Sequence, residues 1–481
     1  MLRLARTFSF FCLFAAISFA VSAAEIQPVK YVFLFIGDGM SIAQQQMGEE
    51  FLQKTEQRGL KINTMPYKSL TTTHAAGDEF VTDSAAAATA IACGVKTDNR
   101  AIGLDAEGNR AESIAELARK NGRKIGIISS VTINHATPAG FYAHNTHRNN
   151  EYEIALDMIA SGFDYFGGGG VAQNNDRNAE KYAGDIYDLA KEAGYTLVRT
   201  TEAIRSLKPA AENVNKKVMA FPHSSAIPYA IDSSADDIRL PEFTRQAIEL
   251  LDNPNGFFIM VEGGAIDWAC HDNDGATAIR DLIEFDDAVS VAFNFAEKHP
   301  GEVLIVVTGD HETGMLSVSN SSTVYQVYVS LLANQKASGG TLITMTERFV
   351  KEGGENATFD NYKVFITENT GLVFTEEGHW QPGNLNLTQN EMRELENDFN
   401  RTKAAIVLGD AGRGKDRVVR TMIRILNNKS GLTWGGGGHT GMPVITATWG
   451  NQAESIAKAI KDNTDIAKQL KQAVSAISLS P

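Results

Sequence analysis

The stretch KYVFLFIGDGM, residues 30–40, joins an uninterrupted apolar run to a glycine-rich turn that carries a single acid, Asp38. A short continuous apolar run of this kind is typical of a strand whose two faces are both buried. Comparable runs alternate along the chain with segments of helical spacing, so we expect further strands at 124–131, 257–261, 303–307 and 444–448, and helices at 83–94, 112–120 and 276–298. This alternation predicts an α/β fold, a doubly wound and mostly parallel sheet with helices on both faces.

One long stretch, residues 317–434, breaks the alternation. It is polar, and Thr388 followed by Glu391 three residues later forms the capping-box pattern that begins a helix. We therefore interpret 317–434 as an insertion into an α/β domain made of residues 25–316 and 435–481. Two roles for this insertion stay open: a lid over a site, or a separate subdomain.

The first 24 residues have the features of a secretory signal peptide. Arg3 and Arg6 precede an apolar run over residues 8–21, and small residues suited to cleavage follow. We expect a periplasmic or secreted protein with no membrane span. A disulfide between Cys93 and Cys270 and two buried thiols are both compatible with the sequence, and we favour the thiols.

Composition narrows the class of partner. The chain has 481 residues, 43% of them hydrophobic, and a formal net charge of −14. The apolar content is that of an ordinary soluble globular protein. Proteins that bind nucleic acid through its phosphates are normally basic, so we expect no nucleic acid as a specific partner.

Acids and histidines gather where the expected strands end. In open α/β sheets, ligands bind outside the carboxyl ends of the strands. The residues found there are Asp38, Thr137, Glu262, Asp267, His271, Asp310, His311 and His439. A mixture of imidazole and carboxylate ligands suits zinc, and the number of candidates exceeds what one ion needs. The sequence therefore predicts a site for two or three metal ions.

A serine and an arginine complete the candidate site. Ser84 opens the alanine-rich helix in VTDSAAAAT, residues 81–89, where free N–H groups and the helix dipole favour phosphate. A serine there also commonly caps its helix. Arg148, in YAHNTHRN, residues 142–149, carries a guanidinium that can bind two oxygens of a phosphoryl group.

Taken together, these motifs resemble those of the alkaline phosphatases. The segments that match are Asp83-Ser84 with its small residues, GDGM at 37–40, VEGGAID at 261–267, TGDHET at 308–313 and HTG at 439–441. The resemblance covers almost the whole chain after the signal peptide, apart from the insertion. It implies a metal-dependent phosphomonoesterase that acts through a phosphoserine intermediate and forms a homodimer. For the insertion it implies either a lid that covers the site or a subdomain that contributes to the dimer surface.

The resemblance also implies a role for each residue. Asp267, His271 and His439 would hold a first zinc ion. Asp38, Asp310, His311 and the Ser84 oxygen would hold a second, and Asp38, Thr137 and Glu262 a magnesium ion. Arg148 would bind two phosphate oxygens. Two positions near the third ion distinguish branches of the family, and here they are His135 and Trp268, which would support this site and leave the identity of its ion open.

Two other functions are weighed against this one. Related phosphodiesterases and nucleotide pyrophosphatases share the two-zinc core but resemble this chain less, because they commonly use threonine as nucleophile and lack the third site. A non-catalytic protein that binds zinc or phosphate would need the same ligands but no nucleophile. Ser84, Arg148 and the pair Thr137 and Glu262 favour hydrolysis of small phosphate monoesters.

Overall fold

The computed structural model describes residues 29–208, 216–320, 322–376, 378–409 and 414–475. The expected signal peptide lies outside these residues. Among the described residues, no helix is long and apolar enough to cross a membrane.

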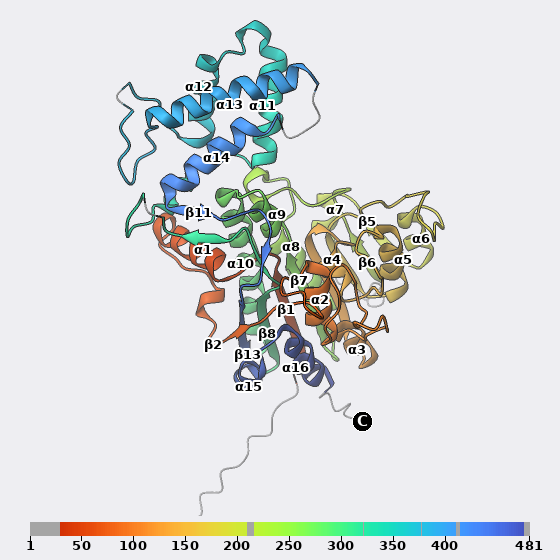
Figure 1. Ribbon diagram of the computed structural model, residues 1–481. Coiled ribbons are helices and arrows are strands. Elements are labelled where there is room, and N and C mark those ends of the chain that lie inside the picture. The colour runs from red at the N-terminus through yellow and green to blue at the C-terminus, as the bar shows by residue number, and fades with distance from the viewer. Residues whose placement is uncertain (1–28, 209–215, 321, 377, 410–413, 476–481) are drawn as a thin grey trace, which may run out of the picture.

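A nine-stranded sheet forms the centre of the molecule (Figure 1). Its spatial order is β2-β13-β8-β1-β7-β3-β4-β6-β5. The strands are β1 (Tyr31–Gly37), β2 (Tyr67–Thr71), β3 (Lys124–Thr132), β4 (Tyr165–Gly169), β5 (Tyr195–Val198), β6 (Lys217–Ala220), β7 (Phe257–Gly263), β8 (Val303–Gly309) and β13 (Val444–Gly450). All neighbours pair in parallel except β13, which is antiparallel to both β8 and β2. The predicted mostly parallel sheet is confirmed.

Both faces of the sheet are buried, as the continuous apolar runs predict. Along β1, Tyr31, Phe33 and Phe35 belong to one hydrophobic cluster, while the alternate residues Val32, Leu34 and Ile36 belong to another. Helices α1 (Ile42–Thr55), α8 (Leu240–Leu251) and α10 (Gly275–Ala296) supply the first cluster. Helices α2 (Ser84–Cys93), α3 (Ile114–Lys120), α5 (Glu151–Ser161), α6 (Ile186–Glu192), α15 (Ala453–Ala459) and α16 (Asn463–Ser475) supply the second.

Strand β4 escapes sequence-based prediction because its second half is Gly167-Gly168-Gly169. Glycines usually weaken a strand. Here they allow close contact between backbones: a Cβ on Gly168 would lie 1.8 Å from the Ser129 carbonyl oxygen, and φ at Gly168 is +119°. The smaller elements are α4 (Ala136–Ala139), α7 (Thr201–Arg205), α9 (Ala265–His271) and the 3-10 helices η1 (Ile62–Thr64) and η3 (Ala230–Asp232).

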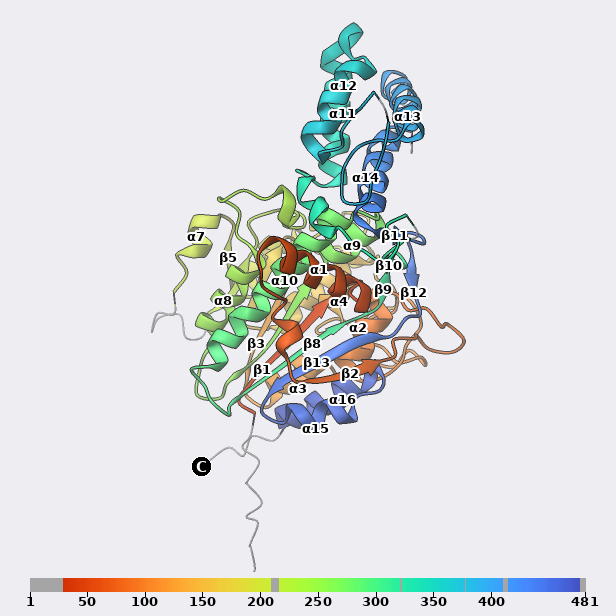
Figure 2. The same ribbon diagram turned by 90° about the vertical axis from the view of Figure 1, so that its left-hand side faces the viewer.

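The helical part of the predicted insertion projects away from the α/β core in both views (Figures 1 and 2). It begins and ends in the antiparallel pair β10 (Leu316–Val318) and β11 (Leu432–Trp434). Between them lie η4 (Val329–Asn334), α11 (Gly339–Gly353), η5 (Gly354–Asn356), α12 (Phe359–Thr370), α13 (Gln389–Val407) and α14 (Arg417–Ser430). These helices have a hydrophobic cluster of their own, which includes Leu342, Tyr362, Phe399 and Met422.

Two local predictions are confirmed. Thr388 is the N-cap of α13, and its hydroxyl accepts from the Glu391 N–H at 3.2 Å while the Glu391 carboxylate accepts from the Thr388 N–H at 2.7 Å. Cys93 and Cys270 are buried free thiols. Burial raises the pKa of the Cys93 thiol to about 12, so this group stays protonated at neutral pH.

Candidate active site

The predicted site residues meet at the carboxyl ends of three neighbouring strands. Strand β1 pairs with β7 on one side and β8 on the other, with Ile36 level with Glu262 and Gly37 level with Gly309. Asp38 follows β1 directly, and Asp310 follows β8 directly. The three strand ends therefore deliver their acids to one place, as the general rule for open α/β sheets predicts.

The innermost cluster consists of Asp38, Asp310 and His311, and all three are fully buried. The His311 Nε2 atom lies 3.3 Å from Asp38 Oδ1 and 3.3 Å from Asp310 Oδ2. Burial, reinforced by the neighbouring carboxylates, raises the pKa of Asp38 far above its usual range and that of Asp310 to about 8. Burial also lowers the pKa of His311 well below its usual value, so the ring is neutral. A neutral imidazole beside two carboxyl groups becomes a donor set for a divalent cation when the cation displaces their protons.

A second cluster lies nearer the surface and contains Asp267, His271 and His439. The His271 Nε2 atom is 3.1 Å from Asp267 Oδ2, and His439 Nε2 is 3.7 Å from Asp267 Oδ1. Although burial opposes it, the hydrogen bond from His271 and the nearby histidines hold the pKa of Asp267 below its usual value. The same hydrogen bond raises the pKa of His271 to about 9.

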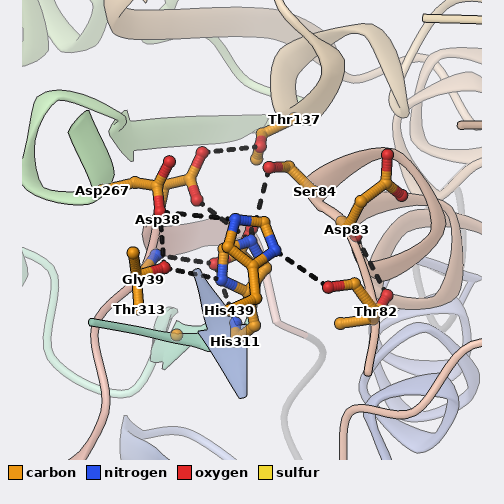
Figure 3. A network of polar contacts seen from close by, with 12 residues as sticks. Asp38, Gly39, Thr82, Asp83, Ser84, Thr137, Asp267, His311, Thr313 and His439 are labelled. Carbon is orange, nitrogen blue, oxygen red and sulfur yellow. Dashed lines mark hydrogen bonds and ion pairs between the residues drawn. The ribbon is translucent and has the colours of Figure 1, made fainter. Parts of the chain in front are cut away.

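A backbone carbonyl oxygen contacts the Nδ1 atom of each histidine in this second cluster and so orients its ring. The His271 Nδ1 atom lies 2.6 Å from the Gly437 carbonyl oxygen, and His439 Nδ1 lies 2.9 Å from that of Thr82. Donation from Nδ1 would leave Nε2 as the ligand atom once a cation takes the place of the Nε2 proton, which is how metal-binding histidines are commonly held. Figure 3 shows the His439 ring between Thr82 and Asp267.

A third cluster contains Asp38, Glu262 and His135. Thr137 joins it, because its hydroxyl lies 3.5 Å from Asp38 Oδ2 (Figure 3). The His135 Nδ1 atom is 3.9 Å from Glu262 Oε1. Asp38 therefore belongs to both the first and the third cluster.

The residues present fit bound cations. Among the described residues, one oxygen each of Asp38, Glu262 and Asp310 is buried and makes no hydrogen bond. Buried polar atoms are normally satisfied, and buried carboxylates this close to each other repel. Divalent cations would satisfy these oxygens and neutralise the repulsion.

Ser84 lies at the first turn of α2, beside the innermost cluster. Its hydroxyl oxygen is 3.3 Å from His311 Nε2, and the side chain points toward the carboxylates (Figure 3). The preceding residue, Asp83, is the helix cap, since its carboxylate accepts from the Ala86 N–H at 3.0 Å. Ser84 is thus not needed as the cap, and its hydroxyl is available for chemistry.

Two side chains hold the Arg148 guanidinium. Its Nη1 donates to Asp83 Oδ2 at 3.1 Å, and its Nη2 donates to His135 Nε2 at 3.0 Å. Because arginine has five N–H donors, these contacts fix the plane of the group and leave donors for a phosphate. Trp268 packs edge-on against the His135 ring, with ring centroids 6.1 Å apart.

Sequence reasoning missed several supporting residues. Thr313 donates from its hydroxyl to Asp267 Oδ1 at 2.5 Å, Asp83 binds Arg148 as described, and the Ser129 hydroxyl donates to Glu262. Asp83 directly precedes Ser84, and Thr313 follows His311 by two positions. This closeness in sequence is the signal that could have identified them. Ser129 lies within a buried strand, where the sequence gives no sign of its contact.

The family model described as alkaline phosphatase matches residues 29–476. The chain belongs to the alkaline phosphatase family. It is 31% identical over 457 residues to alkaline phosphatase 3 of Bacillus subtilis, a match that covers 93% of this chain and 89% of that protein.

Solved structures agree. The cold-active alkaline phosphatase from the psychrophile Shewanella sp. has a TM-score of 0.75 and 27% identity, covering 92% of this chain and 99% of that one. The Thermus thermophilus alkaline phosphatase shares the fold, with a TM-score of 0.76 at 23% identity over 96% of this chain and 95% of that one. This alkaline phosphatase therefore hydrolyses phosphate monoesters, and its three clusters have the ligand types to hold metal ions.

Proposed function

We propose that this alkaline phosphatase uses two zinc ions, one magnesium ion and Ser84 to hydrolyse monoesters through a phosphoserine. The observation that carries the proposal is the position of the Ser84 hydroxyl, 3.3 Å from His311 in the innermost cluster. Asp267, His271 and His439 would hold the first zinc ion, and Asp38, Asp310 and His311 the second. When bound, a zinc pair stabilises the entering and leaving oxygens of an in-line displacement.

The protein's own groups define two displacements. The Ser84 oxygen forms a bond to phosphorus while the ester P–O bond breaks and the alcohol leaves. Water then attacks the phosphoserine, which releases inorganic phosphate and restores the Ser84 hydroxyl. Arg148, fixed by Asp83 and His135, donates to the phosphoryl oxygens, and such preorganised donors stabilise the charge on these oxygens throughout the transfer.

We assign magnesium to Asp38, Thr137 and Glu262, and we infer that His135 supports this site without binding the ion. The guanidinium can only donate, so His135 Nε2 must accept from Arg148. Its Nδ1 atom lies 3.9 Å from Glu262 Oε1 and is buried with no hydrogen-bond partner among the described residues, so we infer that it would hold a water bound to the magnesium ion. Oxygen ligands are those that magnesium prefers.

We also propose that His135 and Trp268 loosen the binding of phosphate, which the variant with His135→Asp and Trp268→Lys tests. It replaces the acceptor for Arg148 with a carboxylate and adds a cation near the third cluster. We expect product inhibition by inorganic phosphate to become stronger, as measured by its inhibition constant. Unchanged phosphate affinity would contradict this proposal.

The decisive experiment for the function compares an aryl phosphate monoester with the matching diester. Both are assayed after chelation and again after zinc and magnesium are returned. We expect monoester turnover that disappears on chelation, returns with the metals and far exceeds diester turnover. A preference for the diester would instead favour a phosphodiesterase of the same superfamily, and metal binding without turnover of either ester would favour a binding protein.

Three further proposals concern the protein as a whole. Residues 1–24 are a signal peptide that directs the chain to the periplasm or the exterior, which N-terminal sequencing of the mature protein tests. Residues 25–316 and 435–481 form the catalytic domain, and 317–434 form a lid or dimer-surface subdomain. The protein is a homodimer, which light scattering of the purified protein with and without the insertion tests.

A further inference from the structure

The segment that leads into the insertion and the segment that leaves it form one long hairpin. After Asp310 and His311, β9 (Glu312–Thr313) pairs antiparallel with β12 (His439–Thr440), and β10 pairs with β11 just beyond. Predicted metal ligands therefore lie on both arms of this hairpin. The position of His439 relative to His311 depends on how the arms are held together.

The two rings on these arms are in direct contact. The His311 and His439 rings stack with centroids 3.7 Å apart and an interplanar angle of 22°. His311 belongs to the innermost cluster and His439 to the outer one. A small shift of one arm would therefore change the distance between the two proposed zinc ions.

Glu312 lies between the arms and is only 3% exposed. One carboxylate oxygen accepts from the Thr440 hydroxyl at 2.5 Å, across the hairpin and next to His439. The other accepts from Gln44 Nε2 at 3.1 Å and from the Leu316 N–H at 3.2 Å. A single buried carboxylate thus joins both arms to helix α1.

The contact with α1 extends to the loop that carries Asp38. Gln44 Nε2 also donates to the Thr313 carbonyl at 2.9 Å, and Gln44 Oε1 accepts from the Ser41 N–H at 3.1 Å. Ser41 is the cap of α1 and lies three residues after Asp38. The network therefore connects the loop after β1 with the two arms of the hairpin.

We propose that Glu312 is a positioning residue that holds His439 in place for zinc by joining the two arms of this hairpin to helix α1. Charge-assisted hydrogen bonds are short and about twice as strong as neutral ones, which suits a carboxylate for this task. The inference rests on the zinc assignment proposed above. It predicts that loss of the Glu312 contacts weakens zinc at the outer cluster more than at the inner cluster.

The test measures zinc dissociation constants of the full-length mature protein by competition with a chromophoric chelator. We expect Glu312→Gln to weaken one zinc site about 10- to 100-fold, the usual effect of removing a residue that orients a ligand. Thr440→Val removes only the contact across the hairpin and should weaken the same site, which keeps the test valid if Glu312→Gln folds poorly. Glu391→Gln is the matched control, because Glu391 accepts from Thr388 and Lys429 within the insertion, and it should leave zinc affinity unchanged.

A second background separates positioning from general destabilisation. If Glu312 acts through His439, Glu312→Gln should cause no additional loss of zinc affinity in a protein that already carries His439→Ala. Equal losses in both backgrounds, or a lower melting temperature of the metal-free protein with unchanged zinc affinity, would overturn the inference. Failure of the unmodified protein to bind two zinc ions would instead overturn the zinc assignment itself.

Discussion

The α/β core and the helical insertion are built in different ways. In the core, alternate residues of a single strand supply two hydrophobic clusters, and the site lies where several strands end. The insertion has one cluster of its own among helices α11 to α14, while its residues Val329, Leu332 and Leu426 pack in one of the core clusters. The core's packing and its chemistry therefore depend on the same strands, whereas helices α11 to α14 pack mainly on one another.

Removal of the Ser84 hydroxyl should produce the largest effect. We expect Ser84→Ala to lower kcat by a factor on the order of 10⁵, in the range known for loss of a nucleophile. Ser338→Ala is the matched control, since Ser338 caps α11 in the insertion and is also buried. The control variant should keep its kcat. Loss of activity in both variants, or full turnover by Ser84→Ala, would contradict the role of Ser84 as the nucleophile.

Two phenylalanine truncations should separate the regions by stability. Phe33 and Phe399 are fully buried in the core and the insertion, respectively. Replacing either with alanine should cost about 3–5 kcal/mol of the free energy of unfolding. We expect Phe33→Ala to lower the melting temperature of the core. We expect Phe399→Ala to produce a separate calorimetric transition at lower temperature, in which the insertion unfolds while activity persists. A single transition in both variants would show that the regions unfold together.

Metal removal should affect only the core. A ligand present at 100 times its dissociation constant stabilises the folded state by about 3 kcal/mol, so chelation should lower the melting temperature of the core transition. The buried oxygens of Asp38, Glu262 and Asp310 are the cause, because they lack hydrogen-bond partners among the described residues. Calorimetry with and without zinc checks this, and an equal shift of the insertion transition would contradict it.

Helix caps should give the smallest effects. Ser113 caps α3 in the core and Thr388 caps α13 in the insertion, and each forms a capping box with a glutamate. Either cap replaced by alanine should cost about 1 kcal/mol. In chemical unfolding followed by activity and by circular dichroism, Ser113→Ala should shift both signals. Thr388→Ala should shift the circular dichroism signal alone, and a matching loss of activity would refute the separation.

The sequence predicts the sheet and the site well because the site residues directly follow the buried strands. Buried strands appear as apolar runs, and ligands such as Asp38 and Asp310 stand directly after them, so their proximity follows from the fold class. The antiparallel direction of β13 could not be predicted, since an apolar run has no directional signal. Strand β4 could not be predicted either, because its glycines allow a close contact between backbones and give the sequence no alternating apolar pattern.

Contacts that depend on distant segments were beyond prediction. Thr440 reaches Glu312 across 128 positions of the sequence, and Arg148 meets His135 and Asp83 only after three loops have folded together. No local propensity records such contacts. The identities of the ligands are therefore visible in the sequence, while the residues that orient them become visible only in the structure.

The pairing of Val318 with Leu432 has a consequence for engineering. Because this ladder already brings the two ends of the intervening segment together, a replacement segment has to span only the gap between neighbouring strands. The entropic cost of closing such a loop grows slowly with its length. A foreign domain with adjacent termini, such as a fluorescent reporter or a binding module, has to leave Val329, Leu332 and Leu426 in place, because these residues of the insertion pack in the core's own hydrophobic cluster.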